Sequence, residues 1–167
     1  MNAPARVGLV GCGVISHAYA KNAAAFDSFE IVACADRDEA RSMALAAEHG
    51  LDAVDVESLL ADAQVDVVLN LTPPAAHAAV TLAALEAGKH VYSEKPLGMT
   101  APDAAELLAL ADARGLPMSP RSMSARASWS VPPRKMSGAH ATRRPRASAS
   151  ASSSAASGAV IASGFSE

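Results

Sequence analysis

Two glycines near the N-terminus stand where a chain could bind a phosphate group. Gly11 and Gly13 follow a short apolar run, residues 6–10, and precede an alanine-rich stretch that tolerates a helix. A glycine turn between a strand and a helix brings backbone amides and the positive end of the helix dipole together, and both favour an anion. The residues expected to cradle a pyrophosphate are Gly11, Cys12, Gly13, Val14 and Ile15.

The three small residues of this turn have separate roles in the expected site. Gly11 permits the tight turn, and Gly13 lets the backbone approach the pyrophosphate. Ser16 stands where a third glycine is common, and a small side chain there still lets helix and strand pack closely. The alternative is a plain glycine turn that joins a strand to a helix and binds nothing.

An acidic residue follows the second expected strand, residues 30–35. At this point of a dinucleotide-binding sheet, the carboxylate of Asp36 would accept hydrogen bonds from the ribose hydroxyls of adenosine. It favours NAD because it repels the 2'-phosphate of NADP, although the neighbouring Arg37 could offset part of this repulsion and NADP stays possible. The alternative role of Asp36 is that of an N-cap for the helix expected near Asp38.

A loop with two prolines ends the third long apolar run, residues 65–71. Thr72 and Pro73 lie at the strand end where an open α/β sheet binds its ligands, so we expect them beneath the cofactor. His77 falls in the first turn of the following helix. It is a candidate cofactor contact, and a surface or capping histidine is the alternative.

A charged pair follows the next expected strand, residues 90–93. The ammonium group of Lys95 could point at a substrate hydroxyl close to the nicotinamide, as acid–base chemistry at a carbinol requires. Glu94 would stand beside it in the cofactor site. A solvated Lys–Glu pair is the alternative interpretation.

The elements that carry these residues alternate between strand and helix. This order predicts an α/β fold, a Rossmann-type doubly wound parallel sheet with right-handed crossovers. The expected strands are residues 6–10, 30–35, 65–71 and 90–93, a short one near 53–54 and one more beginning at 116–118. The expected helices are residues 14–25, 38–49, 55–61, 75–87 and one from 100 or 102 to 114.

The composition changes abruptly after residue 118. Residues 1–118 hold seven basic and sixteen acidic side chains, whereas residues 119–167 hold seven basic and one acidic. The second part is rich in Ser, Ala, Arg and Pro and contains no Leu, so it cannot bury enough apolar surface to offset the entropy of ordering. We therefore expect a dinucleotide-binding domain at 1–118 and a disordered tail at 119–167.

Other features of the sequence bound its partners and its location. The net charge of −3 gives no reason to expect nucleic acid or a membrane as partner, and an arginine-rich arm at residues 143–146 is the weaker alternative. Cys12 and Cys34 form no CxxC pair and are expected to be buried thiols. Because the sequence shows neither a signal peptide nor a long apolar run, we expect a cytoplasmic protein. We expect no bound metal.

Four segments taken in order resemble the glucose-fructose oxidoreductase, inositol dehydrogenase and MocA family. They read GCGVIS, CADRD, NLTPPAAHA and GKHVYSEKPLGMT, and the resemblance covers about residues 5–118. It implies a nicotinamide cofactor and a small polyol, cyclitol or sugar substrate. It assigns Lys95 to substrate and nicotinamide contact, with Glu94 and Pro96 shaping the loop. By the same resemblance Gly11, Gly13, Asp36, Thr72 and Pro73 line the dinucleotide site.

The resemblance also implies a second domain, which would supply the substrate pocket, a catalytic histidine and often the oligomer interface. No such segment is visible in residues 119–167, so we expect a frameshift near Met118 and a domain that binds dinucleotide but has lost hydride transfer. The sequence leaves it open whether the chain is an enzyme. The alternative is a non-enzymatic dinucleotide-binding module whose basic tail contacts a partner.

Overall fold

The computed structural model describes residues 3–116 and 118–120. The first two residues of the tail predicted to be disordered belong to a strand, Met118–Pro120, so the predicted boundary at 118 is two residues too early. The rest of that tail lies outside the described residues. Among the residues described, no helix combines the length and the apolar character that a membrane crossing requires.

The described strands form one parallel sheet. In chain order they are β1 (Ala5–Val10), β2 (Phe29–Ala35), β3 (Asp52–Ala53), β4 (Val67–Asn70), β5 (His90–Ser93) and β6 (Met118–Pro120). Their order across the six-stranded sheet is β3-β2-β1-β4-β5-β6, and every neighbouring pair is parallel. This is the doubly wound order of a Rossmann sheet, which confirms the predicted fold class.

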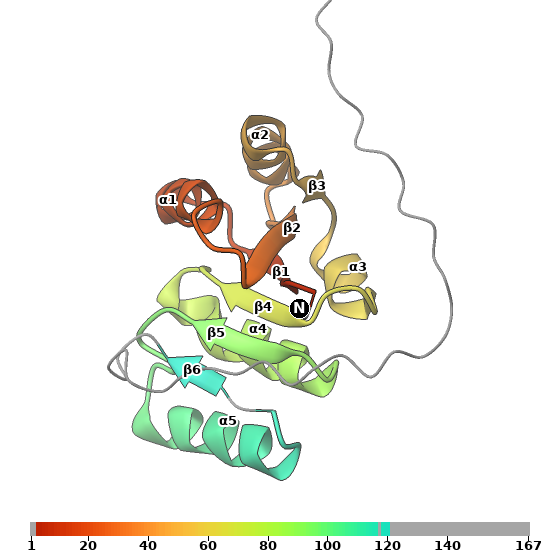
Figure 1. Cartoon of the computed structure of the whole chain (residues 1–167). Helices are drawn as coiled ribbons and strands as arrows, with labels where there is room; N and C mark the ends of the chain where they lie inside the picture. The colour runs from red at the N-terminus through yellow and green to blue at the C-terminus, as the bar shows by residue number, and fades with distance from the viewer. Residues whose placement is uncertain (1–2, 117, 121–167) are drawn as a thin grey trace, which may run out of the picture. The chain divides into compact units, whose positions relative to one another are not determined.

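The helices connect the strands and cover both faces of the sheet (Figure 1). They are α1 (Val14–Ala23), α2 (Glu39–His49), α3 (Val56–Ala61), α4 (Pro74–Glu86) and α5 (Ala101–Ala113). One apolar core, which includes Leu9, Leu45 and Leu69, lies between the sheet and the pair α1 and α2. A second core, with Leu59, Leu85 and Leu107, lies on the opposite face under α3, α4 and α5.

The alternation of side chains along a strand explains the two cores. In β4 the buried residues Val67 and Leu69 belong to one core, whereas Val68 between them belongs to the other. Successive side chains of a strand point to opposite faces, so a strand with helices on both sides needs apolar residues at every position. All four residues of β4 are buried, as its continuous apolar run predicts.

Three helices begin at side chains that accept hydrogen bonds from the first turn. Asp38 caps α2, Asp55 caps α3, and Thr100 caps α5 in a reciprocal arrangement with Asp103. The hydrogen bonds from Ser58 hold the pKa of Asp55 below its ordinary value. The predicted element bounds hold to within two residues. Helix α1 ends at Ala23 rather than at residue 25 because a turn follows it, and no side chain of the alanine-rich stretch indicates this end in the sequence.

The connections turn in opposite directions at the centre of the sheet. The chain leaves β1 through α1 on one face, and it leaves the adjacent β4 through α4 on the other. Loops that diverge in this way open a crevice at the carboxyl ends of the two strands, and open α/β sheets bind their ligands there.

Candidate functional site

The carboxyl ends of four strands meet at one edge of the sheet. Val10 is in register with Ala35 on one side and with Asn70 on the other, and Asn70 is in register with Ser93. The ladder continues one residue beyond each end, since the Leu71 amide donates to the Val10 carbonyl at 2.8 Å. The loops that begin with Gly11, Asp36, Leu71 and Glu94 therefore start side by side.

The two glycines of the first loop differ in what surrounds them. Gly11 has φ of +101°, and a Cβ there would lie 2.6 Å from the backbone of Leu71 and Thr72. Only glycine fits such a position. Around Gly13 a Cβ would meet nothing within 4 Å, so the space over this residue is open.

The first turn of α1 has no side-chain cap. Its N-cap is Gly13, which offers no side chain, and the turn holds no acidic residue. The same is true of α4, whose N-cap is Pro73. Among the described helices, the two without a side-chain cap are thus those that follow the central strands β1 and β4. Their free amides and dipoles favour an anion in the crevice.

An open hollow of about 470 Å³ lies over the first turn of α1. Three of its lining residues, Cys12, Gly13 and Val14, belong to the predicted phosphate turn. The other two, His17 and Arg41, were not predicted from the sequence. The side chain of Val14 is 94% exposed, which is unusual for an apolar residue and leaves an apolar surface at the mouth of the hollow.

Asp36 joins the first loop to the end of β2. Its Oδ2 accepts a hydrogen bond from the Cys12 amide at 2.7 Å, and its Oδ1 accepts one from the Asp38 amide at 2.9 Å. An ionised carboxylate has about four lone-pair positions, so two remain for the hydroxyls of a ribose. The helix N-cap is Asp38, which leaves Asp36 free of the alternative role considered for it.

The basic residues near this carboxylate are exposed. Arg37 lies at the surface directly after Asp36. Arg41 lies in the first turn of α2 and pairs with Asp38, with 3.3 Å between Nε and Oδ2. A guanidinium held at the wall of the hollow could contact a phosphate, so the geometry leaves NADP possible beside NAD.

Asn70 organises the loop with the two prolines. This buried side chain donates to the His77 carbonyl at 3.0 Å and to the Thr81 hydroxyl at 3.1 Å, and it accepts bonds from the hydroxyl and the amide of Thr72 at 2.7 Å and 3.2 Å. The four interactions fix Thr72 and Pro73 at the start of α4. The sequence suggested the loop but not the residue that shapes it, because an asparagine at the end of an apolar strand has many possible partners.

His77 lies inside the protein, which excludes the surface position considered as an alternative to cofactor contact. The residue is 1% exposed, with Nδ1 at 2.6 Å from the Pro96 carbonyl and Nε2 at 2.5 Å from the Thr72 carbonyl. The ring thus joins the loop after β4 to the loop after β5. Both ring nitrogens face carbonyl oxygens of the protein, so the geometry favours a role in holding these loops over a direct cofactor contact.

The loop after β5 holds Glu94 against α1 and leaves Lys95 exposed. Oε1 of Glu94 accepts a hydrogen bond of 2.6 Å from the hydroxyl of Tyr19, which lies on α1. Lys95 is exposed at the same sheet edge, and the peptide bond from Lys95 to Pro96 is cis. Tyr19 is a residue that sequence reasoning missed, because only the fold brings α1 next to this loop.

Cys12 turns its thiol away from the hollow. Its Sγ lies 3.5 Å from the Ala35 carbonyl, and both cysteines are free thiols in buried positions, as predicted. Hydrogen bonding with the Cys34 side chain, and then burial, raise the pKa of Cys12 well above its ordinary value. The Cys12 side chain therefore stays neutral, and its backbone amide is the group that faces Asp36.

The donors at this edge match a dinucleotide. Free amides and the positive end of α1 suit a pyrophosphate, Gly13 leaves room for it, and Asp36 holds two unused acceptor positions for a ribose. These features define a Rossmann-type dinucleotide-binding domain.

A family profile described as an oxidoreductase family with an NAD-binding Rossmann fold matches residues 5–121. The chain belongs to this family, the Gfo/Idh/MocA oxidoreductases, and the resemblance noted in the sequence is confirmed.

Curated relatives include sugar and cyclitol oxidoreductases. The chain is 39% identical over 114 residues to inositol 2-dehydrogenase 1 of Saccharopolyspora erythraea, which covers 66% of this chain and 34% of the relative. It is 37% identical over 113 residues to 1,5-anhydro-D-fructose reductase of Ensifer adhaerens, with the same two coverages. The chain thus spans about a third of the length of the curated relatives it matches.

Solved structures share the fold and hold either cofactor. KijD10, a 3-ketoreductase from Actinomadura kijaniata in complex with NADP and TDP-benzene, superposes with a TM-score of 0.68 at 35% identity, covering 71% of this chain and 37% of that one. GenD2 from gentamicin A biosynthesis, in complex with NAD, gives a TM-score of 0.68 at 30% identity, covering 72% and 35%.

Proposed function

We propose that this chain binds a nicotinamide dinucleotide across the crevice between β1 and β4. The observation that carries the proposal is the uncapped first turn of α1 beside the open space at Gly13. In this arrangement the amides of Val14 and Ile15 bind the pyrophosphate, and Asp36 binds the adenosine ribose. Thr72 and Pro73, fixed by Asn70, support the cofactor from the next loop.

We further propose that the bound cofactor serves oxidation or reduction at a CH–OH group of a sugar or cyclitol. The nicotinamide supplies a hydride acceptor or donor at this edge of the sheet. Lys95 is exposed there and belongs to a loop that His77 and Tyr19 hold from two sides. Its ammonium group would donate a hydrogen bond to the substrate oxygen and orient it, while Glu94 accepts a hydrogen bond from Tyr19.

Turnover needs a group that takes the hydroxyl proton, and a charged ammonium cannot accept one. The match covers about a third of the length of the curated relatives, and the other two thirds of each relative lie outside it. We therefore propose that residues 1–118 bind cofactor, whereas substrate binding and efficient hydride transfer require residues outside this region. In this proposal the tail, residues 119–167, contributes nothing to cofactor affinity.

Calorimetric titration of the full chain with NAD and with NADP tests the proposal. We expect one dinucleotide per chain, with NAD bound more tightly. A polyol panel assayed by nicotinamide absorbance then tests the second step, and we expect turnover near background. A folded chain without affinity for either dinucleotide contradicts the proposed site. Rapid turnover contradicts only the proposal that hydride transfer requires residues outside 1–118.

The alternative function is a non-enzymatic dinucleotide-binding module with a basic interaction tail, which the excess of arginine in residues 119–167 favours. Replacing Arg143, Arg144 and Arg146 by serine in the full chain distinguishes the two. The cofactor-domain proposal expects unchanged affinity for NAD and no lost partner. A partner that is retained by the parent chain and released by this variant supports the alternative.

A further inference from the structure

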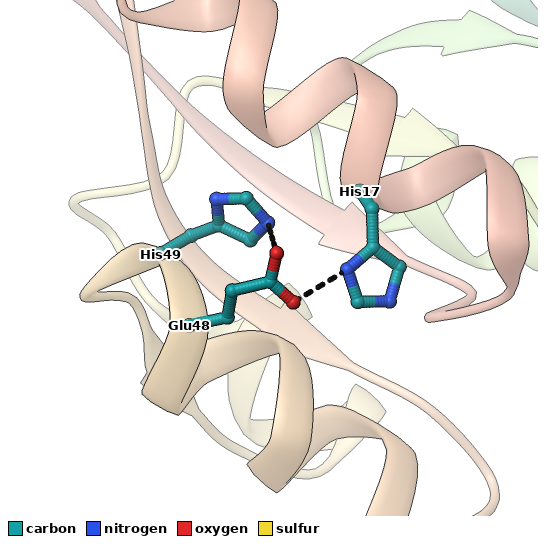
Figure 2. Close-up of side chains that lie close together, drawn as sticks. All are labelled: His17, Glu48 and His49. Carbon is teal, nitrogen blue, oxygen red and sulfur yellow. Dashed lines mark ion pairs between the residues drawn. The ribbon is translucent and has the colours of Figure 1, made fainter.

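Three side chains that could bind a metal converge between α1 and α2. Figure 2 shows the carboxylate of Glu48 between the rings of His17 and His49. Nδ1 of His17 lies 2.8 Å from Oε2 of Glu48, and Nε2 of His49 lies 3.4 Å from Oε1. One ligand atom of each residue lies within 4.8 Å of the other two.

We propose that this group, the interhelical triad of His17, Glu48 and His49, binds a divalent transition metal ion, with zinc the best match. Two imidazoles and one carboxylate are a ligand set that zinc uses, with water completing a tetrahedron. Zinc holds such ligands at about 2.0–2.2 Å, which places neighbouring ligand atoms roughly 3.3 Å apart. The observed separations need only small rotations of the side chains to reach this value.

The surroundings allow that adjustment. The side chains of His17 and Glu48 are 44% and 58% exposed, so both are free to turn. His49 is only 14% exposed in its side chain, and within the described part of the chain its buried Nε2 makes no hydrogen bond. A buried polar atom without a hydrogen bond is costly, and coordination of a metal would remove that cost.

A divalent cation would take the central position between the two rings, whose centroids lie 5.7 Å apart. Each imidazole would supply one ring nitrogen as a ligand, and the single carboxylate would offset half of the charge of the ion.

The site would tie the first turns of α1 to the last turn of α2. His17 also lines the hollow over Gly13, while Glu48 and His49 lie at the far end of α2 from Arg41. The three ligands are not groups to which we assign dinucleotide contact. The two sites adjoin at His17, and a zinc titration without cofactor reads out the metal site alone.

Titration of the full chain with zinc chloride in a non-coordinating buffer, followed by calorimetry, tests the proposal. We expect one zinc ion per chain and a rise in the melting temperature with zinc concentration. Glu48→Gln and His17→Ala should each weaken binding by about tenfold or more, and the double variant His17→Ala/His49→Ala should abolish it. Cobalt in place of zinc should give visible absorption bands of a four-coordinate ion that the double variant lacks.

Two controls keep the outcome clear. Glu86→Gln removes an exposed glutamate from the end of α4 and should leave zinc affinity unchanged, and both cysteines are buried and should not compete. All the substituted side chains are at least partly exposed, and circular dichroism checks that each variant folds. Zinc bound with undiminished affinity by the folded double variant, or no zinc bound by the parent chain, overturns the proposal.

Discussion

The backbone amide of Cys12 donates a hydrogen bond of 2.7 Å to Oδ2 of Asp36, and this contact joins the glycine turn to the end of β2. The other oxygen of Asp36 accepts from the Asp38 amide, so the carboxylate is oriented before any ligand arrives. An acceptor that is already in place binds a ribose without further ordering. The contact thus prepares the turn and the acceptor together.

Replacing Asp36 should change cofactor preference more than cofactor binding as such. Asp36→Asn keeps the shape but removes the negative charge that repels a 2'-phosphate, so we expect the ratio of NADP to NAD affinity to rise by about tenfold. Calorimetric titration of parent and variant with both cofactors measures this ratio. A variant that keeps the parent's ratio while losing affinity for both would show that Asp36 acts on the turn alone.

The two glycines of the turn should respond oppositely to alanine. Gly11→Ala places a Cβ 2.6 Å from the backbone of Leu71 and Thr72 at a positive φ, so we expect the free energy of unfolding to fall by roughly 2 kcal/mol or more. Gly13→Ala meets nothing within 4 Å, so stability should change little. The same methyl group occupies the space over the turn, and we expect affinity for NAD to fall by about tenfold.

Urea unfolding and calorimetry on both variants separate the two effects. Each glycine is the control for the other, because the substitution is the same and only the surroundings differ. Equal losses of stability in the two variants would contradict the geometry. Unchanged NAD affinity in Gly13→Ala would place the pyrophosphate elsewhere.

Much of the fold could be predicted because its signals are local. Continuous apolar runs marked the buried strands, and the helices expected from residues 38, 55 and 100 or 102 begin directly after the caps Asp38, Asp55 and Thr100. The glycine turn and Asp36 could be predicted as well, because each follows directly from a strand end. These features depend on periodicity and backbone chemistry, which a sequence displays along its length.

The contacts between loops could not be predicted in this way. Tyr19 reaches Glu94 from a different helix, and His77 holds two carbonyls, of which that of Pro96 lies 19 positions away. The local sequence around His77 does not indicate which backbone carbonyl from another loop will contact its buried ring. His77 was a candidate cofactor contact, with a surface or capping histidine as the alternative, and no local pattern predicted that two converging loops would bury its ring.

The thiol of Cys12 should be unreactive in the folded protein. Hydrogen bonding with Cys34 and burial raise the pKa of Cys12, so the nucleophilic thiolate is scarce at neutral and mildly alkaline pH. At about pH 8 we expect negligible alkylation by iodoacetamide in the folded chain and rapid alkylation in urea, where the pKa returns to about 8.5. Mass spectrometry of peptides after a timed pulse measures both.

The variant Cys34→Ala tests the cause of this protection. It removes the main interaction that raises the pKa of Cys12 and leaves most of the burial in place. Alkylation of Cys12 in the folded variant should therefore be faster than in the parent and slower than in the unfolded chain. Equal rates in parent and variant would assign the protection to burial alone.

His77 should support both the fold and the cofactor site. His77→Ala removes a buried ring together with its contacts to the carbonyls of Thr72 and Pro96, so we expect the free energy of unfolding to fall by roughly 2–4 kcal/mol. The loops that carry Thr72 and Lys95 would then lose their common anchor. Affinity for NAD should fall by about tenfold in the fraction that remains folded.

His90→Ala is the matched control for this substitution. His90 is also a buried histidine, but it begins β5 at the opposite end of the strand from Ser93 and the cofactor edge. Its loss should lower stability while NAD affinity stays within about twofold of the parent. Calorimetry under conditions where both variants are folded makes the comparison. If the two substitutions weaken NAD binding equally, His77 supports the fold in general, and the bridge between Thr72 and Pro96 has no separate role in the site.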